Sequence, residues 1–160
     1  MSYRIAPVLA SSPRVWLPVL VSALLLPLVA LASPASAQTA VGYERQVVTT
    51  TNAVRHSHHM RDLRPARCLT RFAEKQARAM ADKHQLFHQD LRVPVRRCGL
   101  RHVGENVAVG YPDGRTVVRL GWMKSAGHRA NILTKGYRRI AVGAHQDASG
   151  RWWTAQLFSR

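Results

Sequence analysis

The sequence predicts an α+β fold in which helices come first along the chain and a β-hairpin comes last. Between residues 38 and 81, apolar side chains recur at spacings of three and four residues, which is typical of helices with one buried face. Near the C-terminus, two alternating apolar runs flank a Gly-containing turn, as in a hairpin. Because helical and strand patterns do not alternate along the chain, a parallel βαβ sheet is not expected.

Length and composition favour a single folded domain. The chain has 160 residues, of which 46% are hydrophobic and only two are cysteine. These values exclude an acidic disordered chain and a disulfide-dense miniprotein, and 160 residues are too few for two independent cores to be expected.

The first 37 residues have the pattern of an export signal. A basic start is followed by an apolar stretch from Val15 to Ala32, and then by Ala35 and Ala37 at the spacing that precedes a cleavage site. We expect cleavage near Ala37, a secreted protein, and residues 38–160 as its mature domain. The alternative is a retained membrane anchor, since the stretch is near the minimum spanning length, but its two prolines and small-residue end favour removal.

The chain is strongly basic. It has 24 Lys and Arg against eight Asp and Glu, a net charge of +16, and the predicted mature part keeps 22 basic side chains and a net charge of +14. For an exported protein this charge predicts attraction to anionic cell-envelope polymers. No recognised nucleic-acid-reading motif accompanies the charge, so we expect no specific nucleic-acid partner.

Two helices are expected in the first half of the mature chain. From Gln38 to Met60, one helical face is formed by residues spaced four, four and three apart: Tyr43, Val47, Thr51 and Val54. After Arg64 and Pro65, where proline disfavours helix at the preceding residue, a second and clearer helix runs from Leu69 to Ala81.

The next segments are less regular. Residues His84 to Arg101 contain Pro94 and Gly99 and predict a long loop, and residues 103–110 predict a short turn followed by an extended piece. Asp113 is placed to cap a helix over residues 115–123. We expect four apolar residues of that helix to face inward: Val117, Val118, Leu120 and Trp122.

The chain then predicts another short helix and the hairpin. Ser125 stands at the start of a helix that runs through Leu133, where a helix cap is a better interpretation than a nucleophile. Residues 140–145 and 152–158 predict the two hairpin strands. Trp152 and Trp153 are consecutive in the second strand and point to opposite faces, so we expect one in the core and the other exposed.

The two cysteines, Cys68 and Cys98, form no C-x-x-C pair. Outside the cytosol a lone cysteine pair is more often a disulfide than a pair of reactive thiols. The expected export of the chain therefore predicts a Cys68–Cys98 bond, which stabilises the fold by roughly 3–4 kcal/mol on the chain-entropy model.

Five segments, in order, carry a recognisable pattern: Asn52-x-x-Arg55; Leu69-x-x-x-Ala73-x-x-x-Ala77-x-x-Met80-Ala81 leading to His88; Gly104-Glu105-Asn106; Trp122-Met123-x-Ser125-x-Gly127-His128-Arg129-x-Asn131-Ile132-Leu133; and Gly143 with Gln156-x-Phe158. Together they resemble the CAP superfamily (cysteine-rich secretory proteins, antigen 5 and pathogenesis-related 1) in its short bacterial form. The resemblance implies an α-β-α sandwich with a central antiparallel sheet flanked by helices, and a wide cleft.

The resemblance also implies a cleft lined by two histidines and two glutamates. His88, Glu105 and His128 match three of them, and the position nearest to the fourth is Ser125. Two imidazoles and one carboxylate are suitable ligands for a divalent metal such as zinc, with water in the fourth position. The alternative role for Glu105 is structural, as an acceptor for backbone N–H groups and a neighbouring imidazole, and His128 is equally suited to bonding Glu105.

The other residues of the tryptophan motif are expected to be structural. Arg129 and Asn131 should hold the loop around His128 through backbone hydrogen bonds. A separate cluster, His56, His58 and His59, places two imidazoles on one side of a helix and is either a solvated helix end or a site for a stray transition metal.

The sequence therefore predicts an extracellular binding or interaction module without catalysis. Its ligand would be a small apolar molecule, a glycan or a metal ion in the His/Glu-lined cleft, and we expect a monomer. The alternative is a metal-dependent hydrolase that uses His88, Glu105 and His128, although no complete catalytic constellation supports it.

Overall fold

The computed structural model describes residues 38–160. The predicted export signal and its cleavage site after Ala37 lie outside the described residues. Within residues 38–160, no helix has both the length and the apolar character that crossing a membrane requires.

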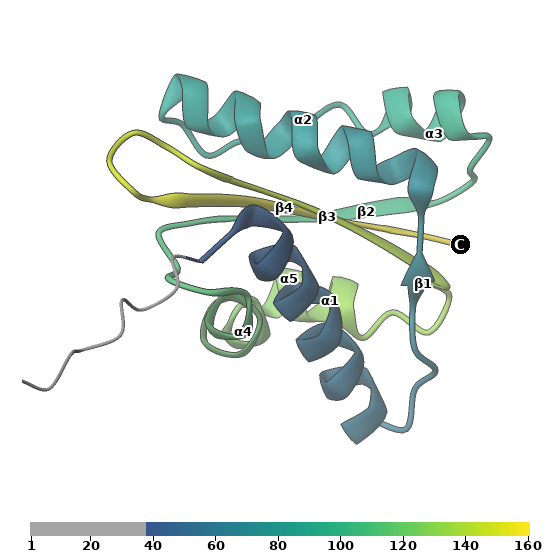
Figure 1. Cartoon of the computed structure of the whole chain (residues 1–160). Helices are drawn as coiled ribbons and strands as arrows, with labels where there is room; N and C mark the ends of the chain where they lie inside the picture. Colours follow the sequence, from purple (N-terminus) through teal and green to yellow (C-terminus); the bar gives the residue numbers. More distant parts are fainter. Residues whose placement is uncertain (1–37) are drawn as a thin grey trace, which may run out of the picture. The chain divides into compact units, whose positions relative to one another are not determined.

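The described residues form two helical layers around one four-stranded sheet. The strands are β1 (Arg64–Pro65), β2 (Val103–Val109), β3 (Arg139–Gln146) and β4 (Trp152–Ser159). The main helices are α1 (Ala40–Ser57), α2 (Arg67–Lys83), α3 (Arg92–Cys98), α4 (Gly114–Thr116) and α5 (Ala126–Ile132). Helices α2 and α3 cover one face of the sheet, and α1, α4 and α5 cover the other (Figure 1). The predicted α+β sandwich is confirmed.

Strand pairing follows the order β1-β3-β4-β2. The expected hairpin is present, with β3 antiparallel to β4, and β2 pairs antiparallel with the other edge of β4. The expected antiparallel arrangement of the central strands is confirmed. The two-residue strand β1 adds a parallel pairing with β3 and sets Arg64 beside Arg139.

Helix α1 is buried at a spacing of four residues along its whole length. Tyr43, Val47 and Thr51 are fully buried as expected, but the next buried residue is Arg55 and not Val54, which is only half-buried. Thr39 caps the helix by accepting a hydrogen bond from the Gly42 N–H at 3.0 Å.

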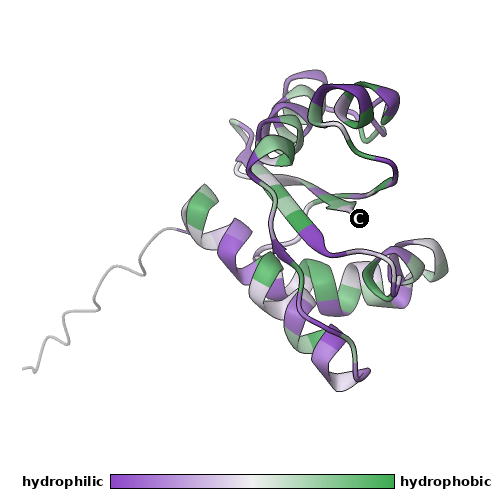
Figure 2. Cartoon of the chain, turned by 90° about the vertical axis from the view of Figure 1, so that its right-hand side faces the viewer, coloured by the Kyte–Doolittle hydropathy of each residue, from purple (hydrophilic) through white to green (hydrophobic). Residues whose placement is uncertain are grey.

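Helix α2 is the element that the sequence predicts best. Its buried positions, among them Leu69, Ala73, Ala77 and Met80, recur at three and four residues and pack on β3 and β4. The view from the side shows that both helical layers alternate hydrophobic and hydrophilic residues, as expected for helices with one face on a sheet (Figure 2).

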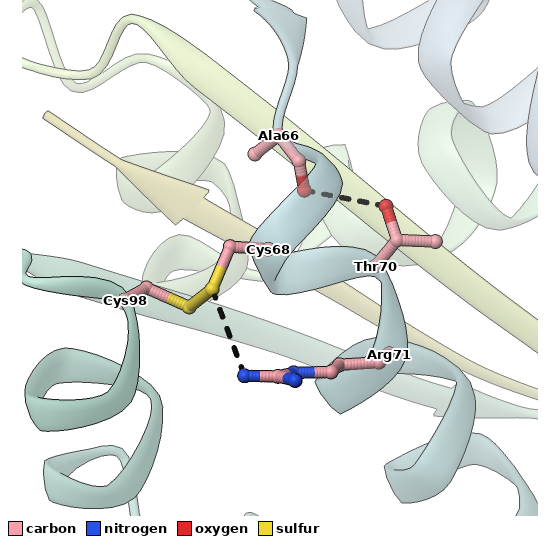
Figure 3. Close-up of a disulfide and its surroundings, with 5 residues drawn as sticks. All are labelled: Ala66, Cys68, Thr70, Arg71 and Cys98. Atoms are coloured by element: carbon pink, nitrogen blue, oxygen red, sulfur yellow. Dashed lines mark hydrogen bonds between the residues drawn. A yellow bond between two sulfur atoms is a disulfide. The ribbon is translucent and has the colours of Figure 1, made fainter.

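The Cys68–Cys98 disulfide is present and joins the start of α2 to the end of α3 across 30 residues of sequence (Figure 3). The segment from His84 to Arg101 was expected to be one long loop. That expectation is wrong, because the segment contains α3. Pro94 is the third residue of α3, in the first turn, where a missing N–H costs no intrahelical bond. The helix ends at Cys98, and Gly99 caps it in the left-handed conformation with a φ of 62°.

The predicted helix over residues 115–123 is present in a modified form. Asp113 caps it through hydrogen bonds from the N–H groups of Arg115 and Thr116 at 2.8 and 2.9 Å. The chain then passes from α4 into a π-helical turn, η1 (Val117–Gly121), and a 3₁₀ turn, η2 (Trp122–Lys124). Leu120 is 64% exposed, so its expected place in the core is wrong. At about 100° per residue, it lies two positions from both Val118 and Trp122 and so faces away from them.

Two further expectations need correction. Ser125 occupies the N-cap position of α5, but its side chain makes no capping hydrogen bond. Trp152 and Trp153 are both buried, because the sheet is covered on both faces. Trp152 packs against Tyr43 of α1, with ring centroids 4.9 Å apart, and Trp153 belongs to the cluster on the α2 face with Met80.

Candidate functional site

The three predicted site residues come from three separate segments of the chain. His88 lies between α2 and α3, Glu105 is on β2, and His128 is on α5. Strand β2 is at the end of the strand order. Groups from the helical layers on both faces of the sheet can therefore approach one another around its outer edge.

His88 and Glu105 are in direct contact. The Nδ1 atom of His88 lies 2.7 Å from Oε2 of Glu105. The two side chains differ sharply in exposure, 58% for His88 and 1% for Glu105. Glu105 thus anchors an imidazole that reaches the surface.

Gln89 completes the surroundings of the buried carboxylate. Its side-chain amide donates to Oε1 of Glu105 at 2.6 Å, and its backbone N–H donates to Oε2 at 3.3 Å. Both carboxylate oxygens therefore have partners, as the structural role considered for Glu105 requires. Sequence reasoning missed Gln89, and the only signal for it was its position directly after His88.

His128 is half-buried on α5, and its environment favours the neutral ring. Burial lowers its pKa, and the neighbouring His88 lowers it further. The backbone carbonyl of His128 accepts a hydrogen bond from the Asn106 side chain at 3.2 Å. His128 therefore presents one donor and one acceptor nitrogen at neutral pH.

These three residues do not fit a metal site as they are arranged. Across residues 38–160, no three His, Cys, Asp or Glu side chains are grouped so that they can hold a metal ion. The same holds for the histidines at the end of α1, where His56, His58 and His59 are all exposed. Glu105 in addition has its oxygens engaged by His88 and Gln89.

The residues of the tryptophan motif hold the neighbourhood of His128 in place. The Trp122 indole N–H donates to the Val107 carbonyl at 3.1 Å, which ties η2 to β2. Arg129 donates to the Met123 carbonyl at 3.1 Å, and Asn131 donates to the Glu105 carbonyl at 3.0 Å. Arg129 and Asn131 thus each donate to a backbone carbonyl, Asn131 to one on β2.

A chain of buried amides connects the site to the rest of the molecule. Asn131 donates to the Asn106 side chain at 2.9 Å, Asn106 donates to Gln156 at 3.1 Å, and Gln156 donates to the Thr51 hydroxyl at 2.8 Å. These four residues lie on α5, β2, β4 and α1. The chain therefore joins one helical layer to two strands of the sheet through satisfied polar groups.

Two sizeable hollows in the surface lie away from the three site residues. One of about 520 Å³ is lined by residues of α1, η1 and η2, including Val54, Leu120 and Met123. Another of about 440 Å³ is lined mainly by arginines. His88, Glu105 and His128 line neither.

Comparison with known proteins decides the family. Residues 48–157, well over half of the chain, match the model of the cysteine-rich secretory protein family, also called CAP. The chain belongs to the CAP family. The CAP fold implied by the five sequence segments agrees with this match.

Relatives of this CAP protein come from several bacteria. An uncharacterised protein of Bacillus subtilis, YkwD, is 33% identical over an alignment of 125 residues that covers 74% of this chain and 48% of the relative. A crystal structure of an extracellular protein with an SCP domain from Bacillus anthracis superposes with a TM-score of 0.68 at 25% identity, covering 76% of this chain and 41% of that one.

A cysteine-rich secretory protein from Staphylococcus aureus shares the fold, with a TM-score of 0.65 at 18% identity over 77% of this chain and 40% of its own. The chain thus spans about half the length of the curated relative described above, and about two fifths of each of these solved structures.

Proposed function

We propose that this CAP protein is an exported binding module without catalytic activity, and that its ligand contacts the surface around His88 and His128. The observation that carries the proposal is the buried Glu105 carboxylate, which is bonded to Gln89 and holds the exposed His88 ring. A carboxylate with these partners is suited to positioning a neighbour and is poorly placed to act as a free base.

The chemistry of the two imidazoles favours a ligand with hydroxyl groups. With Nδ1 of His88 bonded to Glu105, its other ring nitrogen remains available at the surface. The neutral ring of His128 adds another donor and acceptor. Of the two predicted organic ligands, a glycan uses these groups directly, and a small apolar molecule does not.

The net charge supplies the second part of the proposal. A basic exported protein is held near anionic cell-envelope polymers by long-range attraction. The extracellular B. anthracis protein with an SCP domain supports an exported location for this chain. The alternative of a metal-dependent hydrolase lacks support, because the three residues it needs are not grouped to hold a metal among residues 38–160.

The test of the glycan site is calorimetric titration of the purified protein with a tetramer of N-acetylglucosamine. We expect His88→Ala and His128→Ala each to weaken binding at least tenfold, and His102→Ala, an exposed histidine elsewhere, to leave it unchanged. Equal affinity in all four proteins would contradict the site. A zinc titration in parallel tests the alternative, which requires tighter zinc binding by wild type than by His128→Ala.

The charge component has its own test. Binding to cell-envelope fragments should fall steeply between low salt and about 1 M salt, where the Debye length is about 3 Å. Retention that does not change with salt would show that electrostatic attraction is not its cause.

A further inference from the structure

A groove lined by arginines lies on the side of the domain where β1 meets β3. A hollow of about 440 Å³ is lined by Arg61, Asp62, Arg64, Arg138 and Arg139. A second hollow of about 280 Å³ shares Arg61 and Arg138 with the first and adds Arg55, His59 and Lys135 to its walls. Because they share these two walls, we call the two adjoining hollows together the arginine groove. Six positive side chains and one carboxylate line it.

The fold itself brings these charges together. Strand β1 pairs in parallel with β3, and this register sets Arg64 directly beside Arg139. Neighbouring strands are about 4.8 Å apart, and like charges at paired positions destabilise a sheet. Arg138 is next along the chain, and its carbonyl accepts the backbone N–H of Arg64 at 2.9 Å. A bound anion would relieve the repulsion that this pairing creates.

The arginines of the groove have no acidic partners among the described residues. Elsewhere in residues 38–160, Arg92 pairs with Asp90 and Arg151 pairs with Asp147. By contrast, the exposed side chains of Arg61, Arg64 and Arg139 make no ion pair or hydrogen bond within that part of the chain, and neither does Asp62. Their donors are therefore available to a ligand.

One member of the groove is already held in place. Nη1 of Arg138 donates to the carbonyls of Lys135 at 2.6 Å and Tyr137 at 3.0 Å. This fixes the guanidinium and leaves its remaining N–H groups unassigned among the described residues. A guanidinium fixed in advance loses less conformational freedom when it binds.

We infer that the arginine groove binds a linear chain carrying two or more phosphate groups. Guanidinium groups match phosphate oxygens in geometry and charge, and two adjoining hollows of about 440 and 280 Å³ exceed the size of one phosphate. The walls contain no Phe, Tyr or Trp, so they offer none of the stacking that single-stranded nucleic acid uses. The biological meaning of this inference rests on the proposed function. The inference deepens that function because it assigns the binding of anionic polymers to one site on the surface.

The test is calorimetric titration of the purified protein with inorganic tripolyphosphate at constant ionic strength. The double variant Arg64→Gln with Arg139→Gln should bind at least tenfold more weakly than wild type. The matched control is Arg96→Gln with Arg97→Gln, two exposed arginines on α3, which removes the same charge elsewhere and should change affinity less than twofold. Equal weakening of tripolyphosphate binding in both double variants would show that net charge alone attracts the anion, and would overturn the inference.

A single variant tests whether a folding defect, and not the lost charge, explains weaker binding by the double variant. Arg61→Gln lies in the segment between α1 and β1, outside regular structure, and should weaken tripolyphosphate binding severalfold without changing the thermal midpoint. Full affinity in Arg61→Gln and in the folded double variant would refute the inference.

Three further measurements distinguish this inference from its alternatives. His88→Ala should bind tripolyphosphate like wild type, so failure of the glycan site and failure of the groove are distinguishable. Inorganic monophosphate should bind far more weakly than tripolyphosphate, and equal affinity would contradict a chain of phosphates. Binding to anionic lipid vesicles that depends on Arg64 and Arg139, with no tripolyphosphate binding, would assign the groove to membranes instead and overturn the inference.

Discussion

Arg55 shows how much one charged side chain can contribute when it is buried. Its guanidinium donates to the carbonyls of Arg61, Ile132 and Thr134 at 3.0, 2.7 and 3.1 Å. These bonds tie the end of α1 to the end of α5, where the carbonyls have no partners within the helix. Burial lowers the pKa of Arg55, and nearby Arg138 lowers it further, so the carbonyls must compensate for the lost hydration.

We expect Arg55→Ala to lower the free energy of unfolding by about 3 kcal/mol, because three carbonyls, among them the buried one of Ile132, lose a charged donor. Urea denaturation measures this loss. Arg45→Ala, an exposed arginine on the same helix, is the control and should change stability by less than about 0.5 kcal/mol. A similar small effect for both variants would contradict the structural role of Arg55.

The sequence could not assign this role to Arg55. A spacing of four residues continues from Tyr43 through Thr51 to Arg55, but a charged residue on an otherwise apolar face is ordinarily exposed. The same limit applies at the site, where position alone matched His88, Glu105 and His128 to the family. The partner that completes the carboxylate, Gln89, depends on a loop conformation that no local pattern specifies.

Gly143 controls how closely α2 lies against the sheet. A Cβ at this position of β3 would collide with the backbone of Ala73 and Glu74. Gly143→Ala should therefore lower the free energy of unfolding by about 3 kcal/mol. Gly127→Ala in α5, where nothing lies within 4 Å, should instead raise it by about 0.5 kcal/mol. Thermal denaturation of both variants checks the opposite signs.

The disulfide stabilises the connection between α2 and α3. It closes a separation of 30 residues, and on the chain-entropy model its loss costs roughly 3–4 kcal/mol. The variant Cys68→Ala with Cys98→Ala should show this decrease in urea denaturation, and a reducing agent should have no further effect on it. A change below about 1 kcal/mol would mean that the loop is equally constrained without the bond.

Elements with a clear period were predictable from sequence, and elements held by tertiary contacts were not. Helix α2 repeats its buried residues throughout, and β3 and β4 alternate around a turn. Helix α3 has no such period, since it contains Pro94 and ends in basic residues and the bridged Cys98. The π-helical turn changes the pitch after residue 116, and a regular helical pattern does not anticipate this change.

Acid should weaken the whole domain. Hydrogen bonds from Arg92 lower the pKa of Asp90 to about 2, and bonds from Ser149 and Trp153 lower that of Asp147. A carboxylate with a lowered native pKa contributes stability above its unfolded pKa of about 3.9, and this is lost as the pH falls through the native value. Protonation also increases an already high positive charge.

The expected outcome is a decrease in the free energy of unfolding between about pH 5 and about pH 2, measured by urea denaturation at each pH. Asp147→Asn should be less stable than wild type at about pH 5, and the difference should narrow as Asp147 becomes protonated. A constant difference across this range would contradict the role of the Asp147 charge.

The buried amide chain through Asn106 and Gln156 has a consequence for how this protein changes over generations. The Asn106 side-chain amide donates a hydrogen bond to the side-chain carbonyl of Gln156. An apolar replacement of either residue would therefore leave a buried polar group of the other without this partner. Evolution can replace this pair only if both residues change together, or if the rest of the protein is stable enough to tolerate the loss of stability from a single change. We therefore expect this pair of side chains to be inherited as a unit.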